Sequence, residues 1–153
     1  MDVILHCSDS SWGNAAMIDG WHRQRGFSNG YGVHIGYHFV ILNGRLNLAK
    51  TNNYVDGWIE TGRPIDDNDK FEWDEKAAAT LGKNNCIQIC LIGKSGSFTI
   101  KQLKSLESLL LLLKKQFHDI RVYQHSDFNP VNKPHCAGFT PKQMLQFNEL
   151  VKK

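Results

Sequence analysis

The sequence predicts an α/β fold in which a single mixed β-sheet is flanked by helices. Short apolar runs of strand length occur along the chain together with longer stretches whose apolar residues recur at helical spacing. Glycine and proline mark the ends of several of these segments. Strands mixed with long helices form a sheet with helices packed on it, so this is the architecture we expect.

The bulk composition is that of one globular domain covering residues 1–153. A chain of 153 residues can bury a core without disulfide or metal staples. Hydrophobic residues make up 41% and charged residues 22%, as in soluble proteins. The net charge of +3 is mild and no basic run is present, so we expect no specific nucleic-acid binding.

Membrane and secretory features are absent from the sequence pattern. The longest apolar run, at 109–113, is far too short to cross a bilayer, so no membrane contact is expected. Met1 leads almost directly into a strand-like run and not into a signal peptide, which indicates a cytoplasmic chain. Four cysteines are too few for a disulfide framework, and reduced thiols are the default.

The N-terminal third contains two predicted strands and one helix. Residues 3–7 form a buried strand, and residues 14–25 form a short helix that stops at Gly26. Residues 36–42 form the second strand.

A hairpin and a long loop are expected next. Asn43-Gly44 is a strong hairpin turn, so residues 45–50 are predicted as the returning strand. Residues 56–74 are rich in Asp, Gly and Pro and predict a long irregular loop, a kind of segment that is often functional.

The C-terminal half alternates strands with capped helices. Residues 86–92 and 120–124 are predicted strands. A long helix begins after Thr99, which has capping-box spacing with Gln102, and its apolar face comprises Ile100, Leu103, Leu106, Leu110, Leu113 and Phe117. A second capping box, Thr140-Pro141-Lys142-Gln143, opens the last helix, whose stripe comprises Met144, Leu145, Phe147, Leu150 and Val151.

Three candidate metal ligands are divided between the two ends of the chain. His6 lies in the first apolar run, whereas His125 and Cys136 lie near the C-terminus. Zinc favours imidazole nitrogen and thiolate sulfur, and a catalytic zinc has three protein ligands and one open position. A folded scaffold must bring such distant residues together. His135, next to Cys136, is a rival for the third ligand position.

Several segments share their order with one known family. They are the strand that ends in His6, the helix with Trp21-His22 and the closing Gly26-Phe27, Gly36-Tyr37-His38-Phe39 with Asn43-Gly44, the strand at 86–93, and His125-Ser126-Asp127 followed by Pro130, Lys133, Cys136 and Gly138-Phe139. Together they cover nearly the whole chain. In this order the chain resembles the zinc-dependent N-acetylmuramoyl-L-alanine amidases, which include amidase-type phage lysozymes and the peptidoglycan recognition proteins.

The resemblance implies a function and a role for each matching residue. His6, His125 and Cys136 would bind zinc, Tyr37 matches the active-site tyrosine, and Lys133 matches the catalytic lysine before the third ligand. The implied reaction is hydrolysis of the amide between N-acetylmuramic acid and L-alanine in bacterial peptidoglycan. The implied role is that of a phage-type endolysin, which waits in the host cytoplasm until a pore gives access to the wall.

The chemistry suits these residue types. A zinc ion with an open position lowers the pKa of bound water toward about 7 and polarises a carbonyl. Lys133 would neutralise the developing oxyanion, and Tyr37 would orient water or stabilise the tetrahedral intermediate. No His-Glu-x-x-His motif is present, which excludes a thermolysin-type helix site.

The chain departs from the family pattern in the segment at 28–34, which resembles an insertion, in the loop at 56–74, and at three short motifs. Residues 77–82 lack the family's Gly-Ala-His histidine, Cys136-Ala137-Gly138 replaces Cys-Pro-Gly, and Ile87-Gln88 replaces Ile-Gly. The remaining cysteines and histidines are expected in structural or solvated positions, with His38 buried; they are Cys7, Cys90, His22, His34, His38 and His118.

Three other functions stay open at this point. The fold could bind peptidoglycan without cutting it, although non-catalytic recognition proteins often lack the cysteine that Cys136 supplies. The chain could also bind a protein partner such as a phage RNA polymerase, as some related phage lysozymes do. It could finally hydrolyse a different amide, given the missing histidine and the unusual loop at 56–74.

Overall fold

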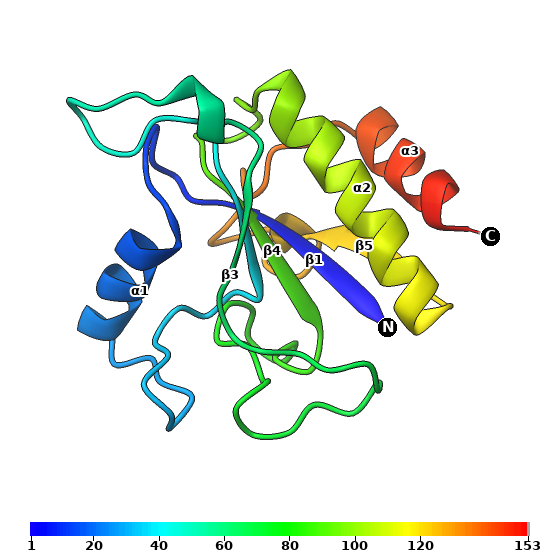
Figure 1. The fold of residues 1–153 in the computed structure, drawn as a ribbon. Coiled ribbons are helices and arrows are strands. Elements are labelled where there is room, and N and C mark those ends of the chain that lie inside the picture. Colours follow the sequence, from blue (N-terminus) through cyan, green and yellow to red (C-terminus); the bar gives the residue numbers. More distant parts are fainter. Residues whose placement is uncertain (153) are drawn as a thin grey trace.

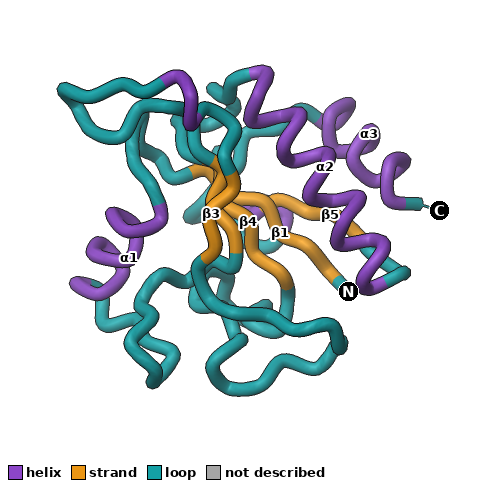
Figure 2. Tube along the Cα trace, viewed as in Figure 1, coloured by secondary structure: helices purple, strands orange, loops and turns teal. Residues whose placement is uncertain are grey.

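A five-stranded sheet forms the centre of the computed structural model, which describes residues 1–152 (Figures 1 and 2). Its strands are β1 (Asp2–Cys7), β2 (Phe39–Ile41), β3 (Ile59–Thr61), β4 (Ile87–Leu91) and β5 (Arg121–Gln124). Their order across the sheet is β3-β2-β4-β1-β5. All neighbours are parallel except β2 and β3, which are antiparallel. The predicted mixed sheet is confirmed.

Helices cover both faces of the sheet. The two longer ones, α2 (Ile100–Phe117) and α3 (Pro141–Val151), lie together on one face, and α1 (Ala15–Gln24) lies on the other (Figure 1). Short 3₁₀ turns, η1 (Asn53–Val55) and η2 (His125–Asp127), lie in the connections. Both predicted capping boxes are present. Within residues 1–152, no helix combines the length and hydrophobicity that a membrane crossing needs.

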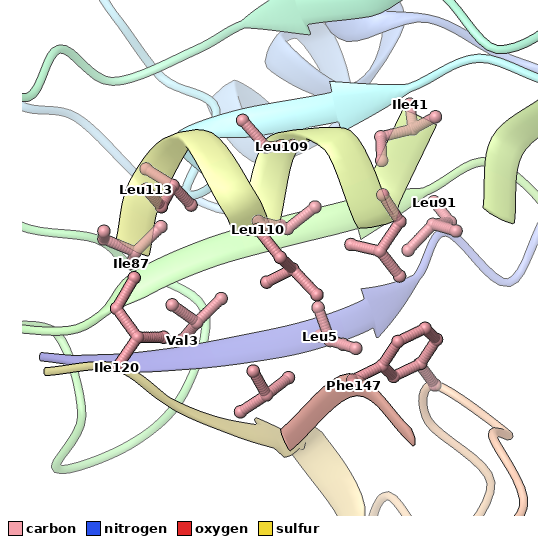
Figure 3. Close-up of a cluster of buried hydrophobic side chains, with 14 of the residues drawn as sticks. Val3, Leu5, Ile41, Ile87, Leu91, Leu109, Leu110, Leu113, Ile120 and Phe147 are labelled. Atoms are coloured by element: carbon pink, nitrogen blue, oxygen red, sulfur yellow. The ribbon is translucent and has the colours of Figure 1, made fainter. Parts of the chain in front are cut away.

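The core is divided by the alternation of side chains along the strands. Val3, Leu5 and Ile87 point toward α2 and α3, where they pack with Leu110 and Phe147 (Figure 3). A smaller cluster lies on the α1 face and comprises Ile18, Ile35, Val40, Leu42, Cys90 and Ile92. Successive strand residues face opposite sides of a sheet. His6 and Gln88 therefore lie on the face opposite α2.

The pairing of β1 with β5 determines where the candidate ligands emerge. The parallel register places Leu5 opposite Gln124. His6 follows Leu5 in β1 and His125 follows Gln124 at the end of β5, so the two histidines lie side by side at the carboxyl ends of adjacent strands. In open α/β sheets this edge is where ligands bind.

The expected return strand at 45–50 is wrong. The side chain of Asn47 accepts hydrogen bonds from the backbone N–H of Ala49 (2.9 Å) and Lys50 (2.8 Å), and these bonds turn the chain at once. Such side-chain-to-backbone bonds compete with a strand ladder. The antiparallel partner of β2 is instead β3, which lies inside the segment at 56–74 that we expected to be irregular throughout. Residues 62–74 are irregular, as expected.

Gln102 ties the start of α2 to the sheet. It is fully buried, and its Nε2 donates to the backbone carbonyls of Ile41 (3.0 Å) and Ile92 (2.8 Å). Its Oε1 accepts the N–H of Thr99 in the capping box (2.9 Å). One side chain thus satisfies a helix end and two carbonyls near the ends of β2 and β4.

We expect Gln102→Met to lower the free energy of unfolding by about 2–3 kcal/mol, because the cap of α2 is lost, the buried carbonyl of Ile92 loses its donor, and the carbonyl of Ile41 keeps only the N–H of Ile92. The matched control is Gln143→Met, because Gln143 holds the same capping-box position in α3. Loss of that cap alone costs roughly 0.5–1 kcal/mol. Urea unfolding measures both variants. Equal losses would show that the bonds to Ile41 and Ile92 contribute nothing.

Candidate metal centre and its cleft

Three metal-binding side chains converge at the carboxyl edge of β1 and β5. The possible ligand atoms of His6, His125 and Cys136 all lie within 4.8 Å of one another. Nδ1 of His6 lies 3.8 Å from Sγ of Cys136, and the two imidazole rings meet edge to face at a centroid distance of 4.7 Å. Both histidines are buried, and Cys136 is half-buried. These three residues could hold one metal ion.

The loop that contains Cys136 connects η2 to α3, and Gln124, the last residue of β5, holds it against the end of that strand. Oε1 of Gln124 accepts hydrogen bonds from the N–H groups of Gly138 (3.2 Å) and Phe139 (3.0 Å), and its Nε2 donates to the carbonyl of Phe139 (3.1 Å). The N–H of Ser126 donates to the carbonyl of Cys136 (2.7 Å). These bonds hold Cys136 opposite His125 although the two lie eleven positions apart in the sequence.

Gly138 is required where this loop crosses the loop after β4. Its φ is +93°, and an added Cβ would clash with the backbone N of Gly96 and the side chain of Ser95. A hydrogen bond from Gly96 N–H to the carbonyl of Ala137 (3.0 Å) joins the two loops at the same place. Glycine alone tolerates both this φ and this close approach.

The three residues line a cleft of about 570 Å³. Tyr37 lines the cleft and packs its ring against that of His6 at a centroid distance of 5.0 Å. The exposed Lys133 also lines it, as do Ala78 and Ala79 from the stretch that lacks the family histidine. The structure therefore brings all five predicted site residues to one cleft. His135 lines the cleft too, but it is exposed and lies outside the three-residue cluster.

Comparison with known proteins finds relatives in sequence and similar folds among solved structures. No family model matches the chain. The endolysins of Enterobacteria phage T3 and Escherichia phage T7 are each 28% identical over 162 residues, covering 97% of this chain and 87% of theirs. The chain is a homologue of these phage endolysins.

Solved structures with a similar fold extend the comparison. The N-acetylmuramoyl-L-alanine amidase LysC from Clostridium intestinale URNW superposes with a TM-score of 0.71 at 22% identity, covering 99% of this chain and 84% of that one. The peptidoglycan recognition protein PGRP-SA of Apis mellifera gives 0.58 at 23% identity, covering 82% and 70%. The expected amidase and peptidoglycan recognition protein fold is confirmed. The expected protein partner stays a prediction.

Burial favours the uncharged form of the imidazoles of His6 and His125 in this chain. It lowers the pKa of His6 to about 3, and the nearby His125, His22 and Lys133 add to the effect, whereas a hydrogen bond to Gln88 opposes it. Burial and Lys133 also lower the pKa of His125. Burial raises the pKa of the Tyr37 hydroxyl well above its usual value, so this group stays protonated and can donate a hydrogen bond. Neutral imidazoles are the form that binds metal.

Cys7 was expected in the core, and it is buried there, but it also reaches the cleft. A hydrogen bond with Cys136 lowers the pKa of the Cys7 thiol to about 7. The same contact, together with burial, raises the pKa of Cys136. The contact arises because the Cys136 loop also packs against the α2 side of the sheet. Sequence alternation alone gives no sign of it.

Two further polar residues of the site were not foreseen as functional. Gln88 and Thr80 both lie behind His6 and are buried. His22 packs against Tyr37 at 5.2 Å, and its Nδ1 accepts the N–H of Gly36 (2.8 Å). Gln88 could have been noticed from the sequence, because it is a polar residue in an apolar strand and stands where the family pattern has glycine. The other histidines are placed as expected, with His38 buried and His118 exposed.

We expect binding of one Zn²⁺ at about pH 7.5 to release one to two protons, one from the thiol of Cys136 and up to one from zinc-bound water, because burial lowers both histidine pKa values below 6.5 and the imidazoles are neutral at this pH. Metal affinity should accordingly rise as the pH rises. Calorimetric titration in buffers of different ionisation enthalpy counts the protons. Release of three or more would show that a histidine is charged before metal binds, because the thiol and the water account for at most two.

Proposed function

We propose that this chain is a zinc-dependent N-acetylmuramoyl-L-alanine amidase that acts on bacterial peptidoglycan as a phage endolysin. Its zinc would be held by His6, His125 and Cys136. The observation that carries the proposal is the convergence of two neutral imidazoles and a thiol at the wall of an open cleft. The endolysin homologues and the amidase fold support it.

The donor set fits zinc in chemistry and in spacing. Zinc–nitrogen bonds of about 2.0–2.1 Å and a zinc–sulfur bond of about 2.3 Å place tetrahedral N and S ligands about 3.6 Å apart. The separation of Nδ1 of His6 from Sγ of Cys136 is 3.8 Å, so little movement is needed. Cysteine and histidine ligands without a carboxylate favour zinc over magnesium or calcium. Three protein ligands also leave a fourth position for water or substrate.

Each residue of the cleft has a distinct part in the proposed hydrolysis. When bound, zinc would act as a Lewis acid on the scissile carbonyl and on water. Tyr37, protonated and packed against the ring of His6, would donate a hydrogen bond that orients the attacking water or stabilises the tetrahedral intermediate. The ammonium group of Lys133 would offset negative charge on the carbonyl oxygen as the tetrahedral state forms. Lys133 can reach this point because it lines the cleft and forms no salt bridge among residues 1–152.

The overall reaction adds one water across one amide bond. The hydroxyl part of water joins the lactyl carbonyl carbon of N-acetylmuramic acid, and the C–N bond to L-alanine breaks. The released amine takes up the proton that water loses. The products are a lactyl carboxylate on the glycan and a stem peptide with a free N-terminal alanine.

We expect Cys136→Ala to lose zinc and wall-lytic activity together, because the site then lacks its only thiolate ligand. Lys133→Ala should retain zinc but lose about 10²–10³ in turnover, the usual cost of one transition-state charge contact. Metal analysis and turbidity loss of wall suspensions measure both effects.

Matched controls separate these roles from general damage. Cys86→Ala removes a buried thiol outside the cleft, and Lys142→Ala removes an exposed lysine from α3. Both should keep metal and activity. Full turnover in Lys133→Ala would remove Lys133 from the mechanism, and retention of zinc by Cys136→Ala would reject the ligand set.

Incubation of purified wall material with the zinc-loaded protein should release stem peptides that begin with alanine. Mass spectrometry of the fragments identifies them, and the Cys136→Ala variant provides the blank. New reducing sugar ends would indicate a glycosidase. Wall binding without released fragments would indicate a recognition module, and cleavage only within the peptide would indicate a different amide.

A further inference from the structure

Gln88 is a fully buried polar residue in the middle of the apolar strand β4. It is flanked by Ile87 and Ile89, and its side chain lies on the same face of the sheet as His6. Oε1 of Gln88 lies 2.6 Å from Nε2 of His6. Burial of an amide costs free energy unless its polar atoms are hydrogen-bonded, so the hydrogen-bond partners of Gln88 must offset that cost.

The orientation of the Gln88 amide is determined by two other groups. Its Nε2 donates to the backbone carbonyl of Lys83 (2.8 Å), which can only accept. The hydroxyl of Thr80 donates to Oε1 (3.0 Å). The amide nitrogen must therefore face Lys83, and the amide oxygen must face His6.

This orientation selects one tautomer of His6. Because Oε1 of Gln88 can only accept, Nε2 of His6 must carry the proton and donate it. The other ring nitrogen, Nδ1, then has a free lone pair, and it is the atom that faces Sγ of Cys136 at 3.8 Å. Metal-binding histidines usually donate their second N–H to such a partner, which fixes both the tautomer and the ring plane.

We propose that Gln88, supported by Thr80 and the Lys83 carbonyl, is a positioning residue that presents Nδ1 of His6 to the metal. The inference rests on the proposed function to the extent that His6 is a metal ligand. It also connects two departures from the family pattern. Gln88 replaces the glycine of the central strand, and Thr80 belongs to the stretch that lacks the family histidine. In this chain that stretch supplies Thr80, which donates to the partner of His6, Gln88.

The test uses Gln88→Met, which removes the acceptor with little change in volume, and Gln102→Met as a matched control. Gln102 is an equally buried and hydrogen-bonded glutamine on the opposite side of the sheet, away from the ligands. Two quantities are measured on folded protein at neutral pH. One is Zn²⁺ affinity by competition with a chelator, and the other is the His6 tautomer from ¹⁵N–¹H NMR of the metal-free chain.

We expect the original chain and Gln102→Met to show His6 protonated at Nε2 and to bind Zn²⁺ with equal affinity. Gln88→Met should bind Zn²⁺ about 10–100-fold more weakly and lose the uniform Nε2–H form. Thr80→Val, a milder change, should give a smaller loss in the same direction. This second variant keeps the test decisive if Gln88→Met does not fold.

An unchanged tautomer and affinity in Gln88→Met, or an equal loss in Gln102→Met, would overturn the proposal. So would an unchanged affinity in Thr80→Val if that is the only variant that folds. The tautomer is measured without metal or substrate. A chain that shows the Nε2–H form but does not cleave walls would therefore contradict the proposed function and leave this role of Gln88 standing.

Discussion

The parallel pairing of β1 with β5 is the constraint on which the candidate site depends. Leu5 of β1 pairs with Gln124 of β5, and the residue that follows each of them is a histidine. Both histidines therefore emerge at the same edge of the sheet. Residues almost 120 positions apart become neighbours through backbone hydrogen bonds alone. Any slip of one residue in this register would turn His6 toward the α2 core, because side chains alternate between faces.

The third donor depends on polar contacts of the loop instead of on the sheet. Gln124, the last residue of β5, holds the backbone of Gly138 and Phe139, while Gly138 lets the loop approach Gly96 closely. Burial then supplies the electrostatics, since it keeps both imidazoles neutral and the Tyr37 hydroxyl protonated. The same packing that holds the ligands together thus gives them the protonation states that metal binding needs, except for the Cys136 thiol, which must ionise.

Most of the fold could be predicted because its signals are local. The apolar runs of β1, β4 and β5 and the two capping boxes follow from residue types at short spacing. Alternation wrongly predicts a return strand at 45–50, because the hydrogen bonds of the Asn47 side chain to its own neighbours turn the chain there.

The site shows the same division between local and tertiary signals. The candidate ligands are recognisable by residue type and by family resemblance, and they do meet. The support of His6 by Gln88 and the contact of Cys7 with Cys136 arise only from strand register and loop packing, which no short pattern contains.

One thiolate and two imidazoles would bind zinc at this site and leave its fourth position open. X-ray absorption of the zinc-loaded chain tests this most directly. We expect one sulfur at about 2.3 Å and three nitrogen or oxygen neighbours at about 2.0–2.2 Å, one of them from solvent. A spectrum without sulfur would exclude Cys136. A spectrum with two sulfurs would show that Cys7 fills the fourth position and closes the site, which would contradict a catalytic zinc.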